Sequence, residues 1–211
     1  MRDCQALTVR VLFIISVFQR SYSSGEGSYS TGKNSQLGVD MDFSVDNSLG
    51  LTLPDRTTQV WAFGVLVTMR LLGHQTGGTI SSFEDEVLPG ASAPFHYHTK
   101  EDETFIMLEG NLTWIAGEKE HAVSNGAALF IPRGTPHSFR NDSGKKARML
   151  VIYTPAGQEQ WFLDVGKPVE DPEKPPEVTP EDMKAAVKLG VEQYGMVFLP
   201  PKAAPAAKDE L

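Results

Sequence analysis

The sequence lacks three features: cysteine pairs, a cluster of basic residues and a long apolar run. A single cysteine, Cys4, is too few for a disulfide within the chain or for a thiolate metal site. Lys and Arg form no basic stripe and the net charge is -8, so the phosphate contacts of a nucleic-acid-binding surface are missing. No apolar run reaches the roughly 20 residues of a membrane-spanning helix. Small molecules and proteins remain as partners.

The first 23 residues predict a secretory signal peptide. A basic start at Arg2 precedes an apolar stretch from Val11 to Phe18, and the small residues Ser21 and Ser23 follow. A mitochondrial presequence is the competing interpretation, because three arginines lie among serines with one acidic residue.

The last four residues, 208–211, favour the secretory interpretation. Lys208-Asp209-Glu210-Leu211 is an address for retention in the endoplasmic reticulum, and an Ala/Pro spacer precedes it. A solvated charged tail is the simpler alternative. We expect residence in the lumen of the endoplasmic reticulum, with the KDEL receptor as a partner.

The chain between these ends predicts one all-β domain with extensions. Residues 24–58 are expected to form a flexible arm, and residues 59–166 alternate short Val/Ile/Phe-rich runs with turn signals, as in a sandwich or closed barrel. Residues 167–199 comprise a Pro-rich connector and a helix, and residues 200–211 form the tail.

The helix is expected over residues 180–194. Thr179 is a suitable N-cap, Pro180 suits the first turn and Gly195 can end the helix. Its apolar residues fall near one face at helical spacing: Met183, Ala186, Val187, Val191 and Tyr194.

The stretch PFHYHTKEDETF, residues 94–105, contains the candidate site. Alternate side chains of a strand share a face, so His96 and His98 would point the same way with their Cα atoms roughly 6.7 Å apart. Two half-exposed strand histidines are an equally good interpretation of this pair taken alone.

The surrounding residues form a fixed pattern. Gly90, His96, His98, Glu103 and Gly110 follow one another in this order, and the successive pairs are separated by five, one, four and six residues.

A second pattern follows at once in GAALFIPRGTPHSFRN. Gly126, Pro132, Gly134, His137 and Asn141 are separated by five, one, two and three residues. The two patterns together resemble the two motifs of the cupin family.

The resemblance implies a cupin double-stranded β-helix, a jelly-roll barrel, here with a C-terminal helical tail. It also implies that His96, His98, Glu103 and His137 bind one divalent transition metal ion. Imidazole and carboxylate ligands suit Fe, Mn, Ni, Zn or Cu. Glu103 would additionally act as the catalytic proton acceptor.

Other polar residues are expected to lie outside this site. We place Glu101 and Asp102 on the solvated rim of the turn, and His74 and His121 on the surface. Alternation from the ligand positions predicts six interior side chains: Phe105, Met107, Trp114, Phe130, Phe139 and Tyr153.

Two glycosylation sequons begin at Asn111 and Asn141. Asn111 follows Gly110, where a hairpin turn is expected. Asn141 occupies the last position of the second motif, where we expect its side chain to serve the fold.

The order of the motifs, with HYHTKEDETFIMLEG, FIPRGTPHSFRN and the late YGMVFLPP, resembles single-domain quercetinase-like cupins. That likeness implies a ring-opening dioxygenase acting on a small hydroxylated aromatic, flavonol-like substrate. The alternatives are a non-catalytic ligand-binding protein similar to auxin-binding proteins, and a metal-dependent isomerase or lyase. Cupin barrels commonly pair, so a homodimer is a further expectation.

Overall fold

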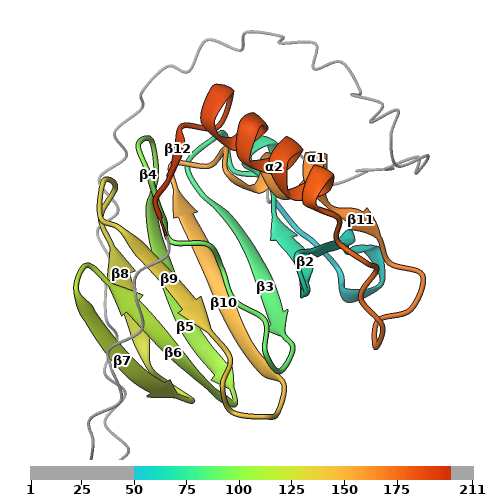
Figure 1. The fold of residues 1–211 in the computed structure, drawn as a ribbon. Helices are drawn as coiled ribbons and strands as arrows, with labels where there is room; N and C mark the ends of the chain where they lie inside the picture. The colour runs from blue at the N-terminus through green and yellow to red at the C-terminus, as the bar shows by residue number, and fades with distance from the viewer. Residues whose placement is uncertain (1–49, 201–211) are drawn as a thin grey trace, which may run out of the picture. The chain divides into compact units, whose positions relative to one another are not determined.

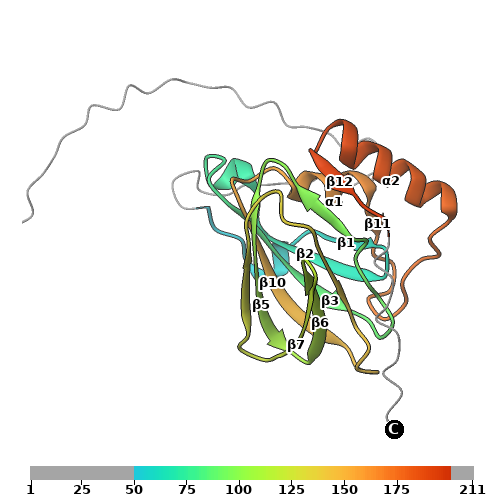
Figure 2. The same ribbon diagram turned by 60° about the vertical axis from the view of Figure 1, so that its left-hand side comes forward.

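The computed structural model describes residues 50–200, which fold into two antiparallel sheets with helices at one end (Figures 1 and 2). The expected signal peptide, most of the arm and the KDEL sequence lie outside these residues. The elements, in chain order, are η1 (Pro54–Arg56), β1 (Gln59–Ala62), β2 (Val65–Leu71), η2 (Gly73–Gln75), β3 (Ser81–Val87), β4 (His96–His98), β5 (Asp102–Glu109), β6 (Asn111–Ala116), β7 (Lys119–Ser124), β8 (Ala128–Ile131), β9 (His137–Arg140), β10 (Ala147–Thr154), α1 (Glu159–Val165), β11 (Lys167–Pro168), α2 (Pro180–Glu192) and β12 (Met196–Phe198).

The strand order confirms the all-β jelly-roll fold with a helical tail. One sheet has the order β11-β1-β2-β3-β10-β5-β8, and the other has the order β12-β4-β9-β6-β7. The apolar run that begins at Val60 is not one strand, because Phe63 and Gly64 have φ of 53° and 87° and turn β1 back onto β2. A left-handed backbone at both residues is typical of a tight two-residue hairpin turn.

Alternate side chains of the central strands build the core between the sheets. Phe105 and Met107 of β5 and Tyr153 of β10 are buried, as predicted, as are Trp114 and Phe139. The prediction for Phe130 is wrong.

Phe130 is 60% exposed because of the strand pairing of β8. In this pairing Phe130 lies opposite Thr104, whereas Leu129 lies opposite Phe105. Directly opposed residues of antiparallel strands point to the same face. Leu129 therefore packs against the core and Phe130 faces outward.

The C-terminal helix begins as predicted. The Thr179 hydroxyl accepts a hydrogen bond from the Asp182 amide, while the Asp182 carboxylate accepts one from the Thr179 amide, which forms a capping box. Its buried positions are Ala186 and Gly190, whereas Val191 is 52% exposed and does not belong to the packed face.

The packing of α2 is close at Gly190, where any side chain would push its neighbours aside by a few tenths of an ångström. A Cβ there would lie 3.0 Å from the Met196 sulfur and 3.2 Å from Nε1 of Trp161, a residue of α1. The Trp161 Nε1–H donates to the Ala186 carbonyl at 3.1 Å and ties the two helices together. Both views show α1 and α2 next to each other beyond the ends of the strands (Figures 1 and 2).

Residues 167–199 contain more than the expected connector and helix. β11 pairs with β1, and β12 pairs with β4 so that Met196 lies opposite His98 and Phe198 opposite His96. The C-terminal segment thus forms the strand next to the histidine pair. No helix among residues 50–200 is long and apolar enough to cross a membrane.

Candidate metal centre

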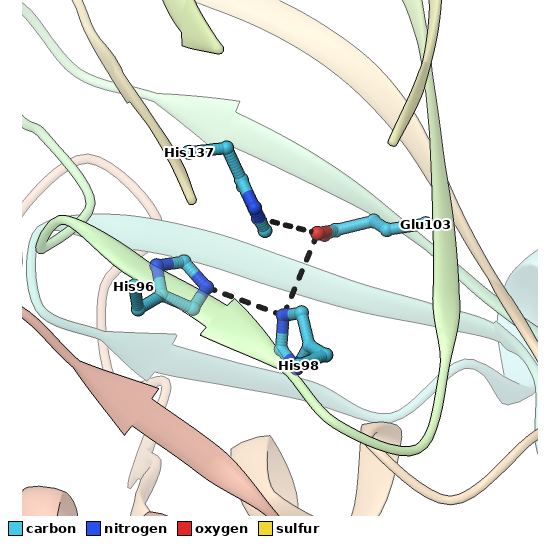
Figure 3. A group of neighbouring side chains, drawn as sticks. All are labelled: His96, His98, Glu103 and His137. Carbon is cyan, nitrogen blue, oxygen red and sulfur yellow. Dashed lines mark hydrogen bonds and ion pairs between the residues drawn. The ribbon is translucent and has the colours of Figure 1, made fainter. Parts of the chain in front are cut away.

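Three strands from both sheets bring the four predicted ligands together (Figure 3). His96 and His98 lie on β4, whose burial pattern turns both inward while Tyr97 between them faces outward. β9 places His137 directly opposite His96 in the same sheet. Glu103 of β5 reaches the group from the other sheet.

The four side chains surround one small volume. Nε2 of His98 lies 3.2 Å from Nε2 of His96 and 3.5 Å from Oε2 of Glu103. Nε2 of His137 lies 2.7 Å from the same carboxylate oxygen. One ligand atom from each residue falls within 4.8 Å of the other three, and all four residues are buried.

Backbone carbonyls orient two of the imidazoles. Nδ1 of His96 lies 2.7 Å from the Pro94 carbonyl, and Nδ1 of His137 lies 2.9 Å from the Thr135 carbonyl. Because a carbonyl can only accept, each Nδ1 carries the proton and each Nε2 directs its lone pair toward the centre. Such a second hydrogen bond fixes the tautomer that a metal-binding histidine needs.

The four ligand atoms are better placed to bind one shared cation than to form hydrogen bonds with one another. Glu103 Oε2 and His137 Nε2 are close, yet neither has a hydrogen bond of acceptable geometry to any of residues 50–200. Unsatisfied buried polar atoms are costly, so a converging group of them calls for a ligand. Three imidazoles and one carboxylate could hold a divalent transition metal.

Electrostatics hold His96 and Glu103 in the protonation state that metal binding requires, whereas Glu103 raises the pKa of His137 despite its burial. Burial, together with His137 and His98, lowers the pKa of His96 to about 3, so His96 is neutral near pH 7. Burial alone would raise the pKa of Glu103, but His137 and His98 outweigh it and hold that pKa below its usual range. A neutral imidazole and an ionised carboxylate are the ligating forms.

The group opens onto a cavity of about 60 Å³ inside the barrel. Its walls are mostly apolar and rich in aromatic side chains, with Phe83, Phe105 and Phe139 among them. Phe198 of β12 closes one side, where its ring stacks on that of His96 with centroids 6.0 Å apart. The cavity suits an apolar, flat molecule with a polar group at the histidines.

Comparison with known proteins identifies the family. The cupin domain model matches residues 83–153. The tetracenomycin polyketide synthase protein TcmJ of Streptomyces glaucescens is 31% identical over 113 residues, which cover 52% of this chain and 75% of that protein. The chain belongs to the cupin superfamily.

This cupin also resembles part of a dioxygenase. Quercetin 2,3-dioxygenase of Bacillus subtilis is 36% identical over 75 residues, or 36% of this chain, but the match spans only 22% of the length of that enzyme. Among solved structures, an RmlC-like cupin from Shewanella frigidimarina is 14% identical with a TM-score of 0.47, covering 52% of this chain and 94% of that one. KdgF from Halomonas gives the same identity and TM-score, with coverage of 52% and 98%.

Two carboxylates beside the cupin site differ in their surroundings. Asp102 lies on the rim, as expected, and accepts two hydrogen bonds from the Arg133 side chain, which lowers the pKa of Asp102 to about 2. The expectation for Glu101 is wrong, since this side chain is 5% exposed and packs near Gly157. Burial raises the pKa of Glu101.

The remaining polar predictions agree with the cupin structure. His74 and His121 are exposed. Asn141 is buried and closes the turn between β9 and β10, as its place in the second motif suggested. Asn111 is exposed at the start of β6, but the expected hairpin turn before it is wrong, because β5 and β6 belong to different sheets.

Most of the other cavity residues were not identified from the sequence, and Asp85 and Phe198 are two of them. Asp85 faces inward from β3, and continuing the alternation from the buried Phe83 would have placed it there. Phe198 gave no such signal, because its position depends on the pairing of β12 with a strand about 100 residues earlier in the chain.

Proposed function

We propose that this cupin is a metal-dependent dioxygenase that opens the ring of a small hydroxylated aromatic compound. The observation that carries the proposal is the convergence of four buried ligand atoms within 4.8 Å at the end of an aromatic-walled cavity. The likeness to part of a quercetin 2,3-dioxygenase supports the reaction class.

His96, His98, Glu103 and His137 would hold the metal ion. A divalent ion of Fe, Mn, Ni, Cu or Zn in this site would polarise a substrate oxygen, and a redox-active one would also serve oxygen chemistry. The backbone-anchored imidazoles keep their lone pairs directed inward throughout, so the site requires little rearrangement to bind the ion.

Glu103 is the group that we propose accepts the substrate proton. Its carboxylate is ionised and faces the cavity, within reach of a hydroxyl placed beside the histidines. Tyr153 lies in the same cavity wall, and burial together with Glu103 raises the pKa of its hydroxyl, so Tyr153 stays a neutral donor.

The size of the cavity points to a single-ring substrate. A volume of about 60 Å³ holds roughly four to six water-sized groups, at about 10–15 Å³ each. One substituted ring matches this space, whereas a three-ring flavonol would require Phe198 to move. The aromatic walls would hold the ring and exclude water from the reacting atoms.

We further propose that the protein resides in the lumen of the endoplasmic reticulum. The support is the apolar stretch of residues 11–18 together with the KDEL sequence at residues 208–211. The proposed partners are the small-molecule substrate and the KDEL receptor. Deletion of residues 208–211 should release the protein into the medium of secretory cells, and unchanged retention would contradict this proposal.

The first experiment measures metal per chain in protein purified without chelators or affinity metals. About one ion per chain is expected in the wild type, with loss in His98→Ala, because removing one ligand from a closed set weakens binding strongly. His121→Ala, which alters an exposed histidine of β7, is the matched control. A wild type that stays metal-free after reconstitution would refute the metal centre.

The second experiment measures oxygen uptake by the metal-loaded protein with a panel of catechols and flavonols. Uptake with single-ring catechols and production of a ring-opened acid support the proposal. Binding without uptake would favour a ligand-binding protein similar to auxin-binding proteins. A rearranged or cleaved product formed without oxygen would favour an isomerase or lyase.

A further inference from the structure

A second carboxylate of the cavity has no role in the metal centre. Asp85 lies on β3, with Phe83 and Val87 on the same inward face. It lines the cavity together with His96, Glu103 and His137. Only 4% of Asp85 is exposed.

The carboxyl group of Asp85 lacks a partner at one oxygen. Oδ1 is buried and accepts no hydrogen bond from any of residues 50–200. A buried, unsatisfied carboxyl is unfavourable, and burial together with Glu103 raises the pKa of Asp85, as expected for a carboxyl among aromatic side chains. The barrel therefore maintains one buried carboxyl oxygen that no group of residues 50–200 satisfies.

The strand register places Asp85 away from the metal centre. Tyr153 of β10 lies opposite both Ser81 and Glu103, so these three residues form one row across the sheet. Asp85 pairs with Met149, four residues further along the strand. At about 3.3 Å per residue this is roughly 13 Å along the strand. The side chains of Phe83 and Phe105 occupy the intervening row.

We infer that Asp85 is a specificity-determining residue that hydrogen-bonds a second polar group of the substrate, at the end of the aromatic ring remote from the metal. The inference rests on the proposed function, since it assumes that one end of the substrate binds a metal ion held by the histidines. It narrows the substrate class to single-ring compounds with oxygen atoms at both ends.

The test compares two probes that differ in one polar group, 3,4-dihydroxybenzyl alcohol and 4-ethylcatechol. Both carry the same pair of metal-binding hydroxyls, and the remote substituents have similar size. Binding is measured by anaerobic calorimetric titration of zinc-loaded protein, because zinc has no redox chemistry that would consume the probes. The variants are Asp85→Leu and Asp85→Asn, each with its metal content determined.

Wild type is expected to bind the alcohol roughly tenfold more tightly than the ethyl compound, which corresponds to about 1.4 kcal/mol. Asp85→Leu should reverse this preference, because the substituted wall no longer accepts a hydrogen bond. Asp85→Asn should keep most of it, since an amide can accept or donate in the same place.

Stability supplies an independent readout that does not depend on any ligand. Asp85→Leu should raise the unfolding midpoint of the metal-free protein, because it replaces an unsatisfied polar group with an apolar one of similar size. A lower midpoint for both Asp85→Leu and Asp85→Asn would show that Asp85 is a structural residue and would overturn the inference.

The outcomes separate this inference from the proposed function. Zinc-loaded wild type that binds both probes equally, or an Asp85→Leu variant that keeps the wild-type preference, overturns the role of Asp85 and leaves the metal centre intact. Wild type that retains no zinc overturns the proposed function and the inference with it.

Discussion

Substitution of Asn141 by alanine should destabilise the barrel more than any single change in its exposed turns. The Asn141 amide donates to the Val87 and Lys145 carbonyls, both at 2.8 Å. Its carbonyl oxygen accepts from the amide and the hydroxyl of Ser143, at 3.0 and 2.7 Å. One side chain thus joins the end of β3 to the turn between β9 and β10.

The expected loss in the free energy of unfolding depends on how deeply each hydrogen bond of Asn141 is buried. The bond to Val87 is buried, so its loss leaves a desolvated carbonyl, at a cost of about 1–3 kcal/mol. The other three bonds lie closer to solvent, where water recovers part of the roughly 1 kcal/mol that each contributes. We expect a total of about 3 kcal/mol, or about 6–12 °C in the unfolding midpoint for a domain of this size.

Urea unfolding of chelator-treated protein measures this loss without a contribution from bound metal. Ser143→Ala is the matched control, since it removes one exposed hydroxyl of the same turn and should cost under about 1 kcal/mol. A loss for Asn141→Ala no larger than that of the control would refute the reasoning.

Three further predictions concern the cavity, modification and pH. Phe198→Ala should enlarge the cavity, so that metal-loaded protein binds flavonols that wild type excludes, as measured by titration. A variant that still excludes flavonols would contradict the proposal that Phe198 limits the size of the substrate. Expression in a secretory host should add an endoglycosidase-sensitive glycan at Asn111 and none at the buried Asn141, as shown by mass spectrometry. Burial and a hydrogen bond to Asp164 raise the pKa of Tyr194 above its usual value, so its contribution to stability is complete below about pH 10 and is lost as the pH rises above that value. As the pH rises over that range, the free energy of unfolding should fall less for Tyr194→Phe than for wild type. Equal losses would contradict the proposed contribution of the Tyr194 hydroxyl.

The four candidate ligand positions could be predicted because the two motifs resemble those of the cupin family, and local rules account only for the orientation of the histidine pair. A strand turns residues i and i+2 to one face, so His96 and His98 required only that their segment be extended. The glycines and prolines around the motifs mark the turns that return β5 and β9 to the same place. What the four residues do remains a proposal.

The features that the sequence did not predict depend on contacts between distant segments. β7 lacks apolar alternation because five of its six residues are exposed. β12 has three residues, and nothing local shows that they pair with β4. The error at Phe130 arose because alternation was extended across a turn, whereas the register of β8 is set by its partner β5.

The burial of two carboxyl groups could not be predicted from the sequence for a different reason. Glu101 and Asp85 belong to a residue type that is almost never buried without a partner, so composition places both outside. Glu101 is buried near Gly157 and Asp85 in the cavity wall, and no short window of sequence contains these tertiary positions.

The division of the ligands between two sheets has a mechanical consequence. His96, His98 and His137 belong to one sheet and Glu103 to the other, so a bound ion would cross-link the two layers of the sandwich. The only cysteine of the chain, Cys4, cannot supply such a link between the sheets. Separation of the layers would then require prior release of the ion, and the lifetime of the folded barrel would be set by the dissociation rate of its metal.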